Sequence, residues 1–147
     1  MKILLPVDGS GASLDAVHHA LRLIREGLAA ELVLANVQEP ASLYELLRAH
    51  DAEVIENLTR AAGEHSLQAA AALCAQAGVE CDQVLGQGEP AHLLIDMAED
   101  AGCGLIVMGS RGKGDTPGTR LGSVAHALLH DSRIPVTVVH PREREDT

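Results

Sequence analysis

The sequence contains almost no aromatic residues. Its 147 residues include no Phe, no Trp and a single Tyr, so the core has to be built from Ala, Val, Leu and Ile. Proteins that bind single-stranded nucleic acid stack the bases on aromatic side chains. Basic residues are also few, 11 against 21 acidic ones, and the net charge of −10 repels phosphate backbones and anionic membranes. We therefore expect neither nucleic acid nor a membrane as a partner.

Cysteines and long apolar runs are scarce as well. Cys74, Cys81 and Cys103 have no CxxC spacing, which argues against a disulfide framework and a zinc site and predicts reduced thiols. No apolar run approaches the roughly 18 residues of a membrane span. The first residues, "MKILLPVDGS", carry one Lys and then an Asp, a pattern typical of a strand and not of a signal peptide. These absences predict a cytoplasmic protein.

Five short apolar runs without alternation predict parallel strands that are buried on both faces. Helical segments separate them, and the second of these, residues 42–78, contains two candidate break points, near residues 50–51 and at Gly63. The strands are expected at residues 2–7, 32–37, 79–85, 104–108 and 135–139. The helices are expected at residues 11–27, at 42–78, after Pro90 and at 122–132.

Alternating strands and helices with right-handed crossovers predict an open, doubly wound α/β sheet with helices on both faces. A single domain should cover residues 1–141, and the charged tail "REREDT", residues 142–147, should be a frayed terminus. In such sheets, ligands bind beyond the carboxyl ends of the strands, where the strand order reverses. The loops that follow the strands are therefore the places in which to look for a site.

The stretch "MGSRGKGDTPGTRLGS", residues 108–123, is the most informative of these loops. It carries five glycines, and no register of it gives the Walker A pattern GxxxxGK[ST], which sets that class of enzyme aside. A strand precedes it and a helix follows it, an arrangement that can bind an anion on backbone N–H groups and the helix N-terminus. Its three cations, Arg111, Lys113 and Arg120, outnumber the single Asp115. The alternative is a solvated connecting loop.

Other patterns in the sequence carry less. The segment "GQGEPA", residues 86–91, fits a loose GxGxxA dinucleotide form, but Pro90 inside it and its place after the third strand favour a tight turn that starts a helix. His126 and His130 have the i, i+4 spacing that could hold a metal, yet no third ligand accompanies them. Ser123 has no apparent base and no GxSxG elbow is present. We therefore predict no catalytic residue and no metal-ligating residue.

The glycine loop also carries a resemblance. Gly109, Gly112, Gly122 and Ser123 have the Gly-x2-Gly-x9-Gly-Ser/Thr spacing of the ATP-binding branch of the universal stress protein family, which this sequence resembles. The resemblance covers the whole chain: "ILLPVDGS" looks like the first strand and acidic loop of the family, "GEP" like its Gly-x-Pro turn, and "GSVAHALLHDSRIPVTVVHP" like its closing helix and strand. It departs between Gly112 and Gly122, where "KGDTPGTRL" is polar instead of Leu-rich.

The resemblance implies a strand order of 3-2-1-4-5 and a binding or signalling role in stress response. The ligand would be ATP, or AMP or ADP, with Mg²⁺ as the counterion of the phosphates. Asp8 would lie near the ribose and adenine, although a carboxylate at this position could instead stabilise the first helix through its dipole. The implied binding residues are Pro6, Val7, Asp8, Val37, Met108, Gly109, Arg111, Gly112, Gly122, Ser123 and Val124.

Two alternatives to this function remain open: a slow ATP hydrolase or nucleotide transferase on the same fold, and an interaction module that binds no nucleotide. The resemblance also implies a homodimer joined through the last strand, formed by Val136, Thr137, Val138 and Val139. That strand carries no charge, and in the implied order it lies at an exposed edge of the sheet. A tail folded over this edge would instead keep the chain monomeric.

Overall fold

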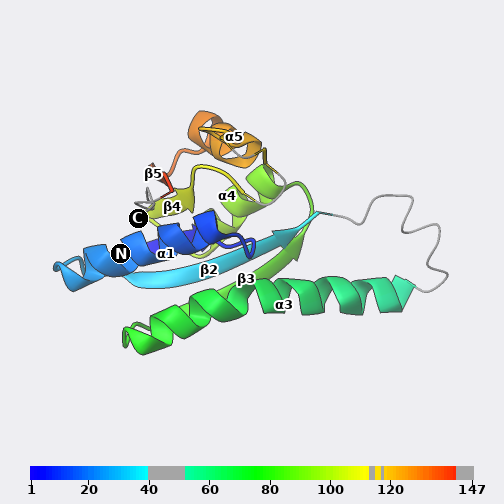
Figure 1. Ribbon diagram of the computed structural model, residues 1–147, viewed down its shortest axis with the longest axis horizontal. Coiled ribbons are helices and arrows are strands. Elements are labelled where there is room, and N and C mark those ends of the chain that lie inside the picture. Colours follow the sequence, from blue (N-terminus) through cyan, green and yellow to red (C-terminus); the bar gives the residue numbers. More distant parts are fainter. Residues whose placement is uncertain (40–51, 113–114, 117, 142–147) are drawn as a thin grey trace, which may run out of the picture.

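The computed structural model describes residues 1–39, 52–112, 115–116 and 118–141. Helices and strands alternate along the chain (Figure 1), and none of the described helices is long and apolar enough to cross a membrane. The elements are β1 (Lys2–Pro6), α1 (Gly11–Arg25), β2 (Glu31–Gln38), α3 (Ala52–Gln76), β3 (Cys81–Gln87), α4 (Pro90–Asp100), β4 (Leu105–Gly109), α5 (Ser123–Asp131) and β5 (Val136–Val139).

The five strands form one parallel sheet in the order β3-β2-β1-β4-β5, which confirms the predicted fold class and strand order. Leu4 in the central strand β1 lies opposite Val33 of β2 and Ile106 of β4. Each predicted strand is present, and most of the strand ends differ from the predicted bounds by one or two residues. The third strand is the clearest case, because it was predicted at residues 79–85 and extends instead to Gln87.

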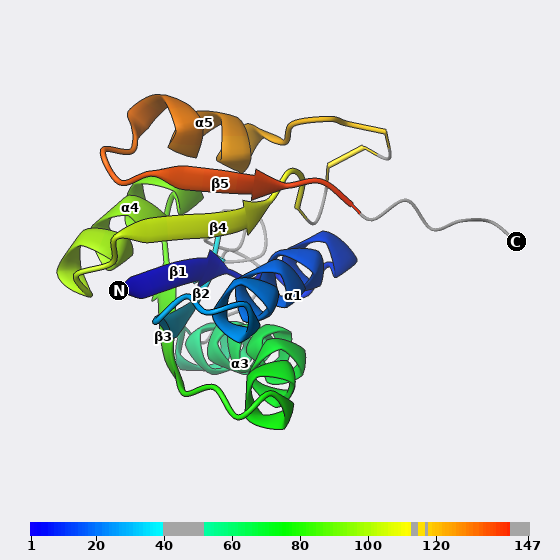
Figure 2. The ribbon, with the colours of Figure 1, turned by 90° about the vertical axis from the view of Figure 1, so that its left-hand side faces the viewer.

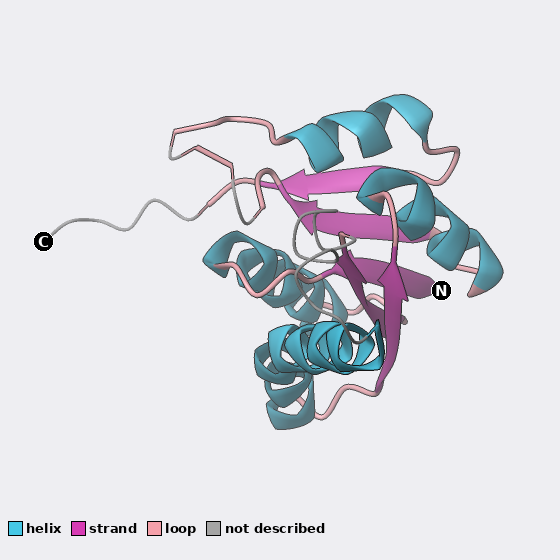
Figure 3. Ribbon diagram, turned by 90° about the vertical axis from the view of Figure 1, so that its right-hand side faces the viewer, coloured by secondary structure: helices cyan, strands magenta, loops and turns pink. Residues whose placement is uncertain are grey.

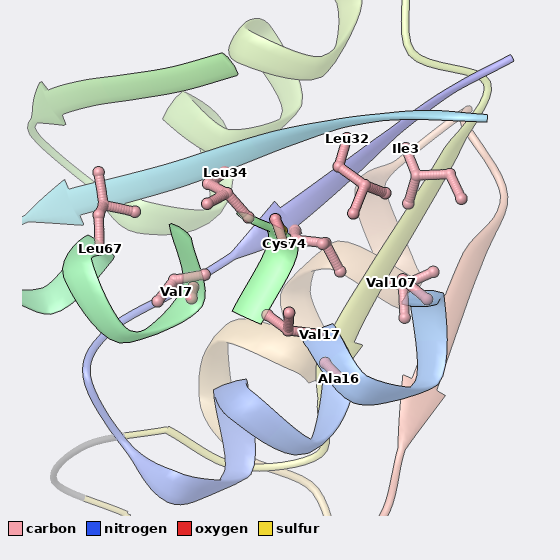
Figure 4. Packing of buried hydrophobic residues seen from close by; sticks show 12 residues of the cluster. Ile3, Val7, Ala16, Val17, Leu32, Leu34, Leu67, Cys74 and Val107 are labelled. Carbon is pink, nitrogen blue, oxygen red and sulfur yellow. The ribbon is translucent and has the colours of Figure 1, made fainter. Parts of the chain in front are cut away.

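Helices cover both faces of the sheet (Figures 2 and 3): α1 and α3 lie on one face, and α4 and α5 on the other. Successive residues of a strand point to opposite faces, so Ile3 and Leu5 pack toward α1 and α3 while Leu4 packs toward α4 and α5. Figure 4 shows the first of these cores, in which Leu67 and Cys74 of α3 meet the sheet. Burial on both faces is the physical reason why the strands are continuous apolar runs.

One expectation about α3 was wrong, because the helix continues without a break through Gly63. A Cβ atom at this position would lie 2.7 Å from Cδ2 of Leu85 and 2.9 Å from Oδ1 of Asn36. The glycine therefore allows α3 to pack closely over the ends of β2 and β3 and does not interrupt the helix. The other candidate break, near residues 50–51, lies outside the described residues.

The strand order reverses between β1 and β4, which are neighbours in the sheet. The chain leaving β1 enters α1 on one face, and the chain leaving β4 enters α5 on the opposite face (Figure 2). Because these two connections diverge, they leave a crevice at the carboxyl ends of the two strands. The fold thus places the loop after β1 and the glycine loop after β4 on either side of one opening.

Candidate functional site

A cavity of about 520 Å³ opens at the carboxyl ends of the strands, and its volume is typical of a site for a small molecule. The residues predicted for the site come from four separate parts of the sequence, and the structure brings all of them to the lining of this one cavity. These residues are Pro6, Val7, Asp8, Val37, Met108, Gly109, Arg111, Gly112, Gly122, Ser123 and Val124.

The loop after β1 supplies the carboxylate of Asp8. Pro6, which has no N–H, is the last residue of β1, and pairing with β2 continues beyond it because the Val7 N–H donates to the Ala35 carbonyl over 2.8 Å. Oδ1 of Asp8 accepts a hydrogen bond from the Ser10 N–H at 2.9 Å, so the carboxylate does hold the turn that starts α1. Its Oδ2 faces the other loop, because a Cβ atom at Gly112 would lie 2.6 Å from it. Asp8 therefore lies between the two loops.

A buried amide in β2 was missed by the sequence prediction. Asn36 is 1% exposed, and its Nδ2 donates to the Val7 carbonyl at 2.7 Å while its Oδ1 accepts from Nε2 of Gln38 at 2.8 Å. These bonds tie the end of β2 to the turn after β1 and position the backbone of Val7 and Val37 at the cavity. A polar residue inside the apolar run "LVLANV" was the available signal.

The glycine loop after β4 is held closed at its base. The Ser110 N–H donates to the Val139 carbonyl, and the Ser110 carbonyl accepts a hydrogen bond from the Gly122 N–H. Further into the loop, Oδ2 of Asp115 accepts a hydrogen bond from the Gly112 N–H at 2.7 Å, and the Asp115 N–H donates to the Gly112 carbonyl at 3.2 Å. Sequence reasoning had counted Asp115 only as a local counter-charge, whereas its carboxylate points into the loop.

Helix α5 begins directly at the cavity. Gly122 is its N-cap residue and supplies no side chain, so no side-chain hydrogen bond caps the helix. Ser123 and Val124 form the start of its first turn and line the cavity. The first N–H groups of a helix have no partner within the helix, and together they carry a partial positive charge. This end of α5 is therefore suited to an anionic group.

Helix α4 also begins at the cavity, after the turn that includes Gly88. As predicted, the segment "GEP" is a tight turn that starts a helix. The Glu89 side chain caps α4, since its carboxylate accepts hydrogen bonds from the N–H groups of Ala91 at 3.3 Å and His92 at 2.9 Å. Pro90 lines the cavity but has no N–H to offer. The N–H groups of Ala91 and His92 at the start of α4 are therefore already bonded within the protein.

The charged lining of the cavity is mainly acidic among the described residues. The carboxylates of Asp8, Glu39 and Asp115 line it, together with the guanidinium of Arg111 and the imidazole of His65. Of the other predicted cations, Arg120 is exposed outside the lining and Lys113 lies outside the described residues. In the part of the chain that the structure describes, no three metal-ligating side chains are grouped to hold an ion.

Helix α3 adds Ala62, His65 and Ser66 to the cavity lining, and sequence reasoning missed all three. Nothing in the sequence marked these positions, because only the packing of α3 over β2 brings them to the strand ends.

The cysteines lie away from the cavity lining. None of them forms a disulfide, and burial together with the neighbouring Cys81 thiol raises the pKa of Cys74 to about 12.

The fold and the cavity define an α/β protein with a ligand-sized opening at the switch point of its sheet. Residues 1–140 match the family model of the universal stress proteins. The chain is 31% identical over 144 residues to the universal stress protein MJ0531 of Methanocaldococcus jannaschii, covering 98% of this chain and 84% of that one. It is 34% identical over 145 residues to the universal stress protein YxiE of Bacillus subtilis, covering 94% and 97%. The chain belongs to the universal stress protein family.

Solved structures have the same fold. The hypothetical protein MJ0577 superposes with a TM-score of 0.81 at 26% identity over 97% of both chains. A universal stress protein in complex with cAMP superposes with a TM-score of 0.63 at 26% identity, over 95% of this chain and 96% of that one. The fold is also shared with a family protein from Arabidopsis thaliana with AMP bound, at 18% identity with a TM-score of 0.71 over 99% and 97% of the two chains.

Proposed function

We propose that this chain binds an adenine nucleotide in the cavity at the switch point and uses the ligand to control a binding interaction in stress response. The observation that carries the proposal is the arrangement after β4. A glycine loop leads there into a helix whose N-terminus has no side-chain cap, and both line a cavity of about 520 Å³.

The nucleoside half of the ligand would lie toward β1 and β2. Apolar side chains of Val7, Val37 and Met108 line this part of the cavity and suit a flat, weakly polar base. The buried amide of Asn36 bonds the Val7 carbonyl and the side chain of Gln38, on either side of this part of the cavity, and the Asp8 carboxylate would accept a hydrogen bond from a ribose hydroxyl. The bound cAMP of a protein that is 26% identical supports a nucleotide of this class.

The phosphates would lie between the glycine loop and the first turn of α5, on the backbone N–H groups of Gly112, Ser123 and Val124. The side chains present suit Mg²⁺ only as an ion that arrives with the phosphates, because the described residues offer no group of three ligands. Asp8 could then add one oxygen to an ion held mainly by phosphate and water. We propose ATP, with ADP and AMP as the alternatives.

The proposal is tested on the purified chain by mass analysis of any ligand that co-purifies with it and by calorimetry with ATP, AMP and adenosine. We expect saturable, one-to-one binding of the adenine ligands. GTP is measured alongside them, to test whether the site prefers the adenine base. Failure of all three adenine ligands to bind at millimolar concentration would leave the interaction module without nucleotide as the function. Release of inorganic phosphate through many turnovers would establish the hydrolase instead.

We also propose that two copies of the chain pair through β5. This strand lies at an edge of the sheet, its residues Val136–Val139 are uncharged and half-buried, and an unpaired strand edge offers N–H and C=O groups to a second chain. A two-fold axis makes antiparallel pairing of two such edges self-complementary.

Val138→Lys at the middle of β5 should place like charges near the axis and shift the dimer toward monomer. Sedimentation velocity of the parent and the variant at micromolar concentration measures this shift. Gln68→Lys adds the same charge at an exposed position of α3, which packs over β2 and β3 at the other end of the sheet, and serves as the control. A monomeric parent, or a variant that stays fully dimeric, would contradict the proposed interface.

A further inference from the structure

The carboxylate of Asp115 occupies the place in the glycine loop where a ligand phosphate is expected. Its Oδ2 accepts the hydrogen bond of the Gly112 N–H at 2.7 Å. The same oxygen lies against Gly122, because a Cβ atom added there would overlap it. One oxygen of the chain itself thus lies between two of the glycines that define the loop.

This oxygen is chemically similar to the oxygen of a phosphate. A carboxylate and a phosphate are both anionic acceptors of backbone N–H groups, and both form charge-assisted hydrogen bonds. The Gly112 N–H therefore cannot serve a phosphate in this geometry until Asp115 has moved away. An entering phosphate also meets the negative charge of the Asp115 carboxylate, so repulsion adds to the competition for this N–H group.

We propose that Asp115 is a specificity-determining residue of this site: its carboxylate competes with the ligand's phosphates and so disfavours ligands that carry more of them. The inference rests on the proposed nucleotide function and names the ligand property that the site selects, which is phosphate charge. Asp115 leaves the binding of the nucleoside half unchanged, because its contacts lie with Gly112 and Gly122, away from the apolar lining formed by Val7 and Val37.

A purely structural role for Asp115 makes a different prediction. If the carboxylate only held the loop in shape, its removal would weaken the binding of every phosphorylated ligand or leave the affinities unchanged. If it competes with phosphate, its removal tightens binding in proportion to the phosphate charge of the ligand. The dependence of affinity on the number of phosphates is thus the readout that separates the two roles.

The experiment is calorimetry with adenosine, AMP and ATP in the presence of a chelator, on the parent chain, Asp115→Ala and Asp115→Asn. Asp96→Ala, at an exposed position of α4, is the control for the loss of one negative charge. We expect Asp115→Ala to bind ATP about tenfold more tightly than the parent, equivalent to about 1.4 kcal/mol. The gain should be smaller for AMP and absent for adenosine.

Asp115→Asn keeps the size of the side chain and guards against a variant whose loop loses its shape. Its neutral amide oxygen can still accept from the Gly112 N–H, but more weakly than a carboxylate does, so we expect a smaller gain for ATP. Thermal unfolding of each variant checks that the fold is retained.

The outcomes separate the inference from the proposed function. Equal or weaker ATP binding by both Asp115 variants, with the parent binding normally, would overturn the competition and leave the nucleotide site standing. A tenfold gain that is identical for adenosine would also overturn it, because phosphate charge would then play no part. Failure of the parent and of every variant to bind any of the three ligands would overturn the proposed function and this inference together.

Discussion

The β3–α4 and β4–α5 connections each contain glycine, follow a strand and lead into a helix at the same cavity, yet they differ in what they offer to a ligand. Before α4, the Glu89 carboxylate accepts hydrogen bonds from the N–H groups of Ala91 and His92. Before α5, the N-cap residue is Gly122 and no side chain caps the helix. The number of glycines therefore does not make an anion site. What decides is whether a side chain of the protein already satisfies the donors at the helix end.

The β4–α5 connection is itself divided into two parts. No side chain caps the helix end. In the loop, however, the Gly112 N–H group donates a hydrogen bond to the Asp115 carboxylate. In the β3–α4 connection, a carboxylate thus satisfies N–H groups at the helix end. In the β4–α5 connection, a carboxylate satisfies an N–H group of the loop, and no side chain caps the helix end. The Glu89 carboxylate stabilises the helix that it caps by about 1 kcal/mol, whereas the Asp115 carboxylate bonds a loop N–H group for which an anionic ligand can compete.

The largest effect on this comparison is expected from Gly122→Val. Gly122 is buried, and a Cβ atom there would overlap Asp115 and lie 3.2 Å from Cα of Arg111. The added side chain should separate the loop from α5 and leave phosphate contacts unmade, at about 1–3 kcal/mol in ATP affinity by calorimetry. Gly11→Val is the matched control, because a Cβ atom at that exposed helix start meets nothing within 4 Å. Equal ATP affinity of Gly122→Val and the parent would refute the assignment of the open helix end.

A smaller effect is expected from Asp8→Ala. The Asp8 carboxylate bonds the turn before α1 and also faces Gly112, so its loss should weaken ATP and AMP alike by about 1.5 kcal/mol if it holds the ribose. Calorimetry and thermal unfolding are measured together, with Asp96→Ala as the control. A lower melting temperature with unchanged nucleotide affinity would instead show that the carboxylate serves only the start of α1.

The smallest effect on the ligand is expected from Glu89→Ala. Loss of an N-cap side chain lowers stability by about 1 kcal/mol, and this should appear in chemical unfolding of the variant. ATP affinity should stay at the parent value, because the capped end of α4 holds no phosphate in our proposal. Glu99→Ala, near the other end of α4 and exposed, is the control. A change in ATP affinity in Glu89→Ala alone would place the N-terminus of α4 in the site and remove the contrast between the two helices.

Much of the fold could be predicted because its signals are local. A strand buried on both faces needs a continuous apolar run, and each of the five runs became a strand. Gly88, Glu89 and Pro90 form a turn and a helix start with residues that are adjacent in the chain. The prediction failed at Gly63, where the requirement for glycine comes from side chains of β2 and β3 and not from the helix.

The sequence by itself determined the elements, their alternation and the spacing of the glycines, since each depends on residues within a few positions of one another. Only the tertiary structure decided how Asn36 reaches Val7, 29 residues away, which residues of α3 line the cavity, and that the Asp115 carboxylate points toward Gly112 and Gly122. The physical reason is that a side chain's hydrogen-bond partner is set by the packing of distant segments. The sequence shows that the loop contains a carboxylate, but only the packed loop shows which N–H group donates a hydrogen bond to it.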